Sequence, residues 1–173
     1  MARLSFVLVD SKYCDYLREE DPCVPYTMDE KSKRPFVGIL LQIDTIPYYA
    51  PLSSPKRKHK TMKNQIDLLK IMDGEYGVIN FNNMIPVHPN SITDIDLATY
   101  PTDSASETKY KELLINQLTW CNAHRTEIIS KAQKLYSLIT GGGGWKSLTE
   151  RCCNFIIDEK KLLCYCTDRG WTM

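Results

Sequence analysis

This chain of 173 residues lacks long apolar runs, and their absence argues against a location within a membrane. No stretch of 18 or more apolar residues occurs, so we expect no membrane-spanning helix. The apolar run Leu4–Val9 is short, and an acid and a lysine follow it where a signal peptide would need a cleavage site. We therefore expect a cytoplasmic protein.

The sequence also lacks the residue patterns of common metal sites and enzymes. Its seven cysteines contain no CxxC pair, and its three histidines lie far apart. Seven is an odd number, so a fully paired disulfide framework within one chain is excluded, and free thiols are expected. No GxSxG, HExxH or P-loop sequence occurs, and the glycine run 141–144 lacks the GK[ST] ending of a phosphate loop. We predict no metal and no cofactor.

The composition that remains is that of an ordinary globular protein. Apolar residues make up 43% of the chain and charged residues 25%, which is close to the average and argues against disorder. The length corresponds to one domain with a substantial core. We therefore expect residues 1–173 to form a single domain.

Hydrophobic patterning separates a strand-rich first half from a helical second half. The strand-like segments are 4–9, 36–43, 48–52, 76–81 and 84–87, with a turn at 44–47. A short helix is expected from Asp10 or Ser11 to Leu17, and an exposed loop over 20–35. Helical spacing of apolar residues over 107–138 predicts one long helix or two, and 148–163 a last helix or a mixed element. Strands first and helices later indicate an α+β domain built on an antiparallel sheet.

Positive charge is concentrated in one segment, although the net charge is only +1. Residues 53–63 read SSPKRKHKTMK, with five Lys or Arg, one His and no acid, and Lys31, Lys33 and Arg34 precede them. The second half of the chain carries the balancing acids. This asymmetry indicates an anion-binding face on a neutral body.

Two hydroxyls and a lysine, Ser53, Ser54 and Lys56, stand where a predicted strand meets this basic segment. Metal-free RNA cleavage needs a group that takes the 2′-OH proton, positive charge on the phosphate and a proton for the leaving oxygen. Lys56 and Arg34 could supply the charge, and His59 is a possible acid or base. On spacing alone, a solvated loop or a phosphate-binding patch is the commoner explanation.

Six segments along the chain carry a family resemblance: SKYCDYL (11–17), RPFVGILL (34–41), APLSSPK (50–56), GVINFNNMIPV (77–87), YKELLINQL (110–118) and CNF (153–155). In the same order, and over nearly the whole chain, these segments resemble the ToxN/AbiQ family of toxins. The resemblance implies a compact, highly twisted, barrel-like antiparallel sheet related to the MazF/Kid toxins, surrounded by helices that include a long one in the second half of the chain.

The same resemblance implies a function. A member of this family is a metal-independent endoribonuclease toxin of a type III toxin–antitoxin system, and its cuts leave 2′,3′-cyclic phosphates. It processes its own repetitive RNA antitoxin and is inhibited by the pseudoknot that each repeat forms. The implied partners are this RNA, in a closed ring of alternating toxin and RNA, and cellular or phage RNA, with a role in phage defence.

The family pattern also implies particular site residues. Ser53 and Ser54 stand at its hydroxyl pair, Lys56 at its active-site lysine and Tyr13 at a tyrosine that faces the site. Arg34 stands where a relative has lysine, and because arginine does not deprotonate, the adjacent Lys33 could replace a titrating amine. The predicted RNA-binding residues are Lys12, Lys33, Arg57, Lys58, His59, Lys60, Lys63, Asn82 and Asn83.

Two alternatives remain at this point. A non-catalytic RNA-binding module would need the basic residues but not Ser53. A MazF-type toxin would be neutralised by a protein antitoxin rather than by RNA. Tandem short repeats upstream of the gene would indicate an RNA antitoxin, and a small acidic reading frame a protein one.

Overall fold

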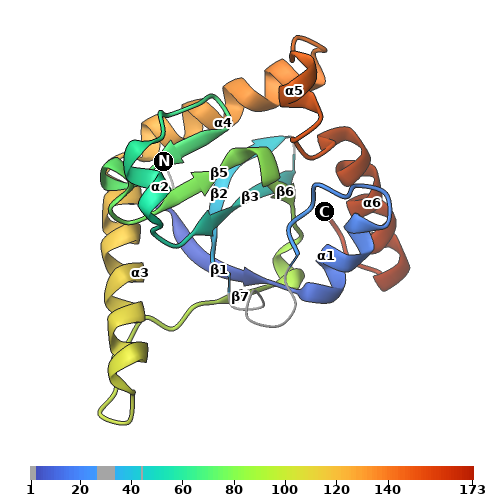
Figure 1. Cartoon of the computed structure of the whole chain (residues 1–173). Coiled ribbons are helices and arrows are strands. Elements are labelled where there is room, and N and C mark those ends of the chain that lie inside the picture. The colour runs from blue at the N-terminus through green and yellow to red at the C-terminus, as the bar shows by residue number, and fades with distance from the viewer. Residues whose placement is uncertain (1–2, 27–33, 44) are drawn as a thin grey trace.

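The computed structural model describes residues 3–26, 34–43 and 45–173 (Figure 1). The strands are β1 (Ser5–Val9), β2 (Phe36–Ile43), β3 (Ile46–Ser53), β4 (Leu68–Lys70), β5 (Val78–Asn80), β6 (Ile85–Pro86) and β7 (Ile92–Asp94). The helices are α1 (Ser11–Arg18), α2 (Arg57–Thr61), α3 (Ala105–Ala123), α4 (Arg125–Thr140), α5 (Lys146–Thr149) and α6 (Phe155–Arg169). Short 3-10 helices are η2 (Met72–Gly74), η3 (Phe81–Asn83) and η4 (Pro89–Ser91). The predicted α+β class is confirmed.

The described strands form one seven-stranded sheet in the order β4-β5-β3-β2-β1-β7, with β6 paired to β3. Every pairing is antiparallel, as the sequence predicted. β3 is the centre of the sheet because it pairs with β2, β5 and β6. Its last residues therefore have neighbouring strands on both sides, which gives the end of β3 a defined position.

Helices cover the sheet from two sides (Figure 1). α4 packs against β2, while α6 packs against β6 and also contacts α1. The core between these layers is aromatic, and its largest fully buried side chains include Tyr13, Tyr48, Phe36, Phe81 and Phe155. This layered core is large enough to hold the ends of the strands rigidly.

Capping residues explain where the helices start. The Ser104 hydroxyl accepts from the Glu107 amide at 3.2 Å, and the Glu107 carboxylate accepts from the Ser104 amide at 2.8 Å, so this reciprocal pair starts α3. Asn154 accepts from the Ile157 amide at 3.2 Å and starts α6. The predicted 107–138 region is two helices, which meet at His124.

Several sequence-based boundaries need correction. Ile43 pairs with Ile46, so the hairpin turn is shorter than the predicted 44–47, and Asp44 lies outside the described residues. The strands β4 and β7 and the helix α2 were not predicted, and β5 is shorter than the predicted segment 76–81. Part of the predicted loop 20–35, residues 27–33, also lies outside the described residues.

Two predictions about the whole chain can be checked directly. All seven cysteines lie among the described residues, none of them forms a disulfide there, and five of them are buried, as expected of thiols that serve as small hydrophobic residues. Within the described ranges, no helix is long and apolar enough to span a bilayer.

Candidate active site

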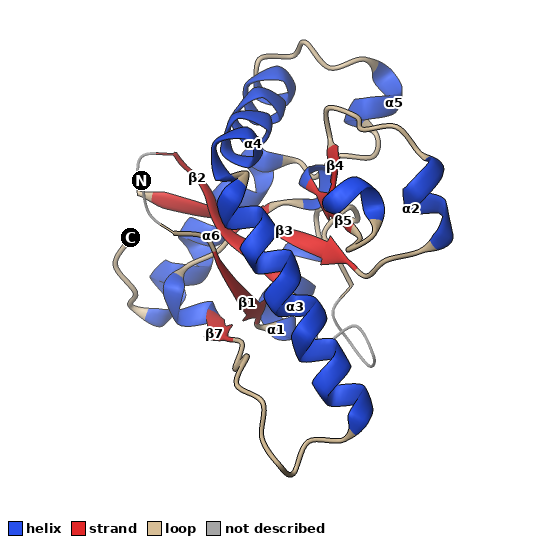
Figure 2. Ribbon diagram, turned by 90° about the vertical axis from the view of Figure 1, so that its left-hand side faces the viewer, coloured by secondary structure: helices blue, strands red, loops and turns tan. Residues whose placement is uncertain are grey.

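The sheet register brings Arg34 and Ser53 together at one end of the sheet. Phe36 pairs with Pro51, and continuing this antiparallel register by two residues puts Arg34 opposite Ser53. On the other side of β3, Ser53 pairs with Val78 at the start of β5. The end of β3 is therefore enclosed by residues from two neighbouring strands. Figure 2 shows the chain continuing from this end of β3 into α2.

The Ser53 hydroxyl is held by two hydrogen bonds. Its oxygen accepts from Arg34 Nη2 at 2.9 Å and from Asn80 Nδ2 at 2.9 Å. These bonds use both lone pairs of the oxygen, so the hydroxyl proton is the one hydrogen-bonding group that it has left. Ser53 is half-buried. Its position suits a group that donates a hydrogen bond to a bound anion.

Arg34 is a half-buried cation. Its Nε donates to the Leu52 carbonyl at 2.9 Å, which fixes the guanidinium plane beside β3. Burial lowers the pKa of Arg34, but an arginine side chain stays protonated in proteins. Among residues 3–26, 34–43 and 45–173, no carboxylate forms an ion pair with it. A fixed cation of this kind is suited to a phosphate ligand.

Ser54 is exposed and lines a narrow crevice between the end of β3 and α3. Gln117 of α3 lines the same crevice and is 2% exposed. Its Nε2 donates to the Tyr76 carbonyl at 2.6 Å, which fixes the orientation of the amide and leaves Oε1 without a partner among the described residues. Gln117 and Asn80 are not among the residues predicted from the sequence, because both come from elements far from the serines in the chain.

Gly77 lies directly against the backbone of the two serines. A Cβ atom at this position would be 2.0 Å from the Ser53 carbonyl oxygen, and the glycine has φ of +95°. Residues with a side chain rarely adopt this conformation, and no Cβ fits at this distance. Gly77 therefore allows β5 to approach β3 closely enough for Asn80 to reach Ser53.

Lys56 caps the N-terminus of α2, and His59 lies in the first turn of this helix. The Lys56 amide donates to His59 Nδ1 at 3.2 Å, and the His59 amide donates to the Lys56 carbonyl at 2.9 Å. The His59 side chain is 3% exposed, and burial, then the charges of Lys58 and Lys56, lower its pKa. The predicted role of His59 in RNA contact, or as an acid or base, is thus corrected to that of a buried residue that positions Lys56.

The basic segment forms an exposed surface on and after α2. The exposed cations are Lys56, Arg57, Lys58, Lys60 and Lys63. Lys60 pairs with Glu75 at 2.7 Å, and Gly74 of η2 packs so closely that a Cβ there would lie 2.4 Å from the His59 carbonyl oxygen. α2 is thus docked on η2, and it follows Ser53 in the chain after only three residues.

Tyr13 does not belong to this site. It is 0% exposed, its hydroxyl donates to the Pro86 carbonyl at 2.6 Å, and its ring packs edge-on against Tyr165. Pro86 pairs with Tyr48, which lies five residues before Ser53 on β3, or about 16 Å along the strand. Tyr13 is therefore a core residue.

Asn82 and Asn83 each make a structural hydrogen bond. The Asn82 side-chain amide donates to the Arg151 carbonyl at 3.1 Å, and that of Asn83 donates to the Cys23 carbonyl at 2.8 Å. Each bond uses one of the two N–H donors of the side-chain amide, so the predicted RNA contacts of both residues stay predictions. Lys12 is exposed on α1, away from α2 (Figure 1), and its role stays a prediction. Lys33 lies outside the described residues.

The chain matches a protein-family model over residues 5–162, and the family is described as "Toxin ToxN, type III toxin-antitoxin system". It is 33% identical to an Endoribonuclease ToxN of Bacillus thuringiensis subsp. kurstaki, with 90% of this chain and 81% of the relative covered. Identity to an Endoribonuclease ToxN of Pectobacterium atrosepticum is 32%, with 91% of each chain covered. An Endoribonuclease AbiQ of Lactococcus lactis subsp. lactis is 28% identical over 77% of this chain and 74% of its own.

Two solved structures are also similar to this chain. One, from a study of selective toxin inhibition by a non-coding RNA pseudoknot in type III systems, aligns with a TM-score of 0.80 and 30% identity, covering 95% of this chain and 98% of the other. A second, from a study of a processed non-coding RNA that regulates a bacterial antiviral system, aligns with a TM-score of 0.76 and 31% identity, covering 92% and 97%.

Proposed function

The chain belongs to the ToxN family of type III toxins, and from this membership and the site geometry we propose that it is a metal-independent endoribonuclease toxin. The observation that carries the proposal is the hydroxyl of Ser53, held by Arg34 and Asn80 beside an exposed basic segment. Arg34 has no carboxylate partner among the described residues, so a phosphate can take that place. A surface of this kind fits an RNA backbone.

The proposed reaction is transesterification of one RNA phosphodiester. The 2′-oxygen forms a bond to phosphorus and loses its proton, while the bond to the 5′-oxygen breaks and that oxygen gains a proton. The products are a 2′,3′-cyclic phosphate and a 5′-hydroxyl. Negative charge builds up on the phosphate, where Arg34 and Lys56 stabilise it. Ser53 donates its free hydroxyl proton to a phosphate oxygen, and we assign to the adjacent Ser54 a part in positioning or proton relay.

The partners follow from the same family membership. We propose that the protein processes its own repetitive RNA antitoxin, is inhibited by the resulting pseudoknot in a closed ring of toxin and RNA, and cuts cellular or phage RNA during phage defence. Its neighbours in structure come from studies of pseudoknot inhibition and of an antiviral system, which supports this proposal. The twisted sheet would then be a variant of the MazF/Kid core, within one domain of residues 1–173.

Single substitutions at the serines separate cleavage from binding. Ser53→Ala removes the hydroxyl without changing charge, so growth inhibition should be lost and uncut precursor RNA should accumulate. Binding of the processed repeat should stay within roughly tenfold of wild type, the loss expected of one hydrogen bond. Lys56→Ala should weaken binding more, because it removes a phosphate contact. Ser54→Ala tests the second hydroxyl in the same way.

Ser147→Ala is the matched control, because Ser147 is an exposed serine on α5, and it should remain toxic. The measurements are growth after expression without antitoxin, and a gel shift with the repeat RNA. If Ser53→Ala stays toxic and still trims the precursor, the assigned site is wrong. If this variant loses both toxicity and binding, Ser53 is structural and a non-catalytic RNA-binding module explains the chain better.

A further inference from the structure

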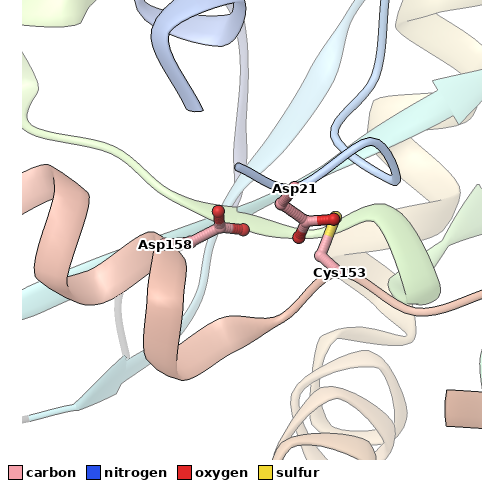
Figure 3. A group of neighbouring side chains, drawn as sticks. All are labelled: Asp21, Cys153 and Asp158. Atoms are coloured by element: carbon pink, nitrogen blue, oxygen red, sulfur yellow. The ribbon is translucent and has the colours of Figure 1, made fainter. Parts of the chain in front are cut away.

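Two carboxylates and a thiol meet in the core (Figure 3), and none of them belongs to the Arg34–Ser53 site. Asp21 follows α1, Cys153 precedes α6, and Asp158 lies in the first turn of α6. One potential ligand atom from each lies within 4.8 Å of the other two. The three residues are 3%, 1% and 0% exposed. Like charges rarely share a buried site unless a cation or a proton is present.

The hydrogen bonds around the cluster differ between its two aspartates. Asp21 accepts from the backbone amides of Cys23 at 2.9 Å and Asn154 at 2.5 Å. Asp158, in contrast, receives no hydrogen bond from a backbone amide or another donor among the described residues, and its carboxyl group contacts that of Asp21. The Asp158 carboxyl group points toward Asp21 in Figure 3. Two ionised carboxylates in contact in the core are unfavourable, so a cation or a proton is needed here.

The nearby Lys161 does not form an ion pair with either buried aspartate. Lys161 Nζ forms ion pairs with Glu19 at 3.1 Å and with Glu20 at 3.9 Å, and it lies 4.0 Å from the centre of the Tyr16 ring. These contacts hold the ammonium group between α6 and the C-terminal end of α1. No ion pair joins Lys161 to Asp21 or Asp158 in the described part of the chain.

We propose that Asp21, Cys153 and Asp158 bind one Zn²⁺ ion in a structural site. A thiolate and carboxylates are ligands that Zn²⁺ accepts, whereas the thiolate disfavours Mg²⁺ and Ca²⁺. Zinc–sulfur and zinc–oxygen bonds of about 2.3 and 2.1 Å require tetrahedral ligand atoms about 3.5 Å apart. Ligand atoms within 4.8 Å reach this geometry through small side-chain movements. The fourth position is left for water or for the half-buried Cys23, whose amide already bonds to Asp21.

Such an ion would join segments that are distant in the sequence. It would tie the residues after α1 to the start of α6, which is also held to η3 because the Cys153 amide donates to the Asn82 carbonyl at 2.8 Å. α6 lies on the other side of the sheet from α2 (Figure 1). The ion would therefore stabilise the fold without contacting the proposed cleavage site, and the inference does not depend on the proposed function.

A shared proton is the competing explanation. Burial, and then Asp21, raise the pKa of Asp158 to about 8, so a metal-free Asp158 would be protonated at neutral pH and could donate to Asp21. The two explanations differ in what they require of Cys153. A shared proton makes no use of the thiol, whereas zinc needs it as a thiolate.

The test uses the full chain purified without a metal-affinity tag, treated with EDTA, dialysed and titrated with ZnCl2 or CoCl2. Metal content after gel filtration should be one Zn²⁺ per chain, and zinc should raise Tm by several degrees. Cobalt should give the near-ultraviolet charge-transfer band of a thiolate ligand. Cys153→Ser and Asp158→Asn should each lose these effects. Cys164→Ser, which removes an exposed thiol elsewhere on α6, should keep them.

Failure to retain zinc, or equal zinc binding by Asp158→Asn and wild type, would overturn the proposal. Asp158→Asn keeps the size of the side chain and removes its charge, so this variant remains informative even if Cys153→Ser does not fold. RNA cleavage is measured in the same EDTA-treated sample, below its Tm, and should persist. If cleavage is lost in EDTA and restored by a divalent ion, the metal-independent mechanism is refuted. The zinc proposal is decided separately, by the measured zinc content of wild type and Asp158→Asn.

Discussion

Gly77→Ala provides a quantitative test of how tightly β5 must approach the two serines. The new Cβ would lie 2.0 Å from the Ser53 carbonyl oxygen, whereas real Cβ contacts are essentially never closer than 3.0 Å. The backbone of Ser53 or of Gly77 must therefore move by about 1 Å, a displacement that can reduce an enzymatic rate by roughly 100-fold. The positive φ adds a backbone cost of about 1–2 kcal/mol to the free energy of folding.

Gly142→Ala separates these two effects. Gly142 also has a positive φ, of +72°, but no atom lies within 4 Å of its ideal Cβ position. This control should lose about 1–2 kcal/mol of stability and cleave RNA at the wild-type rate. Urea unfolding gives the stability of both variants, and single-turnover cleavage of the precursor RNA gives the rate. If Gly77→Ala cleaves as fast as Gly142→Ala, the close approach of β5 does not position the serines.

The basic segment and the buried histidine give two further predictions. Replacing both Lys58 and Lys60 by alanine should reduce the slope of log RNA affinity against log salt concentration by roughly 1.4–1.8, because two phosphate contacts are lost. The control Lys134→Ala should leave this slope unchanged. An unaltered slope in the double variant would place the RNA elsewhere on the protein. The pKa of His59 is lowered from its ordinary value of 6.5, so the stability that it contributes is fully present above pH 6.5 and is lost as the pH falls through the lowered pKa. Urea midpoints measured between pH 5 and 8 should show this loss of stability at low pH. His59→Asn should abolish the pH dependence, because the asparagine oxygen can accept a hydrogen bond from the Lys56 amide and does not titrate. If both proteins lose the same stability at low pH, His59 is not the cause.

The longer elements could be predicted from the sequence because their apolar periodicity is visible in it. The strands β1 and β2 lie within the predicted segments, whereas β3 and the pair α3 and α4 extend beyond theirs by one or two residues at each end. β4 and β7 have only three residues each, which is too short for an alternating pattern to be recognised. α2 has a single buried residue, His59, and depends on its contact with Gly74. Such tertiary contacts leave no periodic signal in the sequence.

The candidate site residues that the sequence indicates are neighbours in the chain or come from paired strands. Ser53, Ser54 and Lys56 are consecutive or nearly so, and Arg34 precedes β2, which pairs with β3. Asn80 and Gln117 reach the site only through β5 and α3, so nothing near the serines indicates them.

The burial of Tyr13 could have been foreseen. Tyr13, Cys14 and Leu17 form the apolar face of α1, and all three are 0% exposed. The spacing between Tyr13 and Leu17 is that of residues on one face of a helix. A tyrosine on such a face more often packs in the core than contacts a ligand.

The position of β3 at the centre of the sheet has a consequence for how this protein is synthesised. Ser53 emerges from the ribosome before β5 and α3, yet Asn80 bonds to its hydroxyl and Gln117 bonds to the strand connection that carries Gly77. A nascent chain or a prematurely terminated product that ends between residues 64 and 77 would contain both serines and the whole basic segment without Asn80 and Gln117. We therefore expect the geometry of the proposed site to form only after α3 has been synthesised.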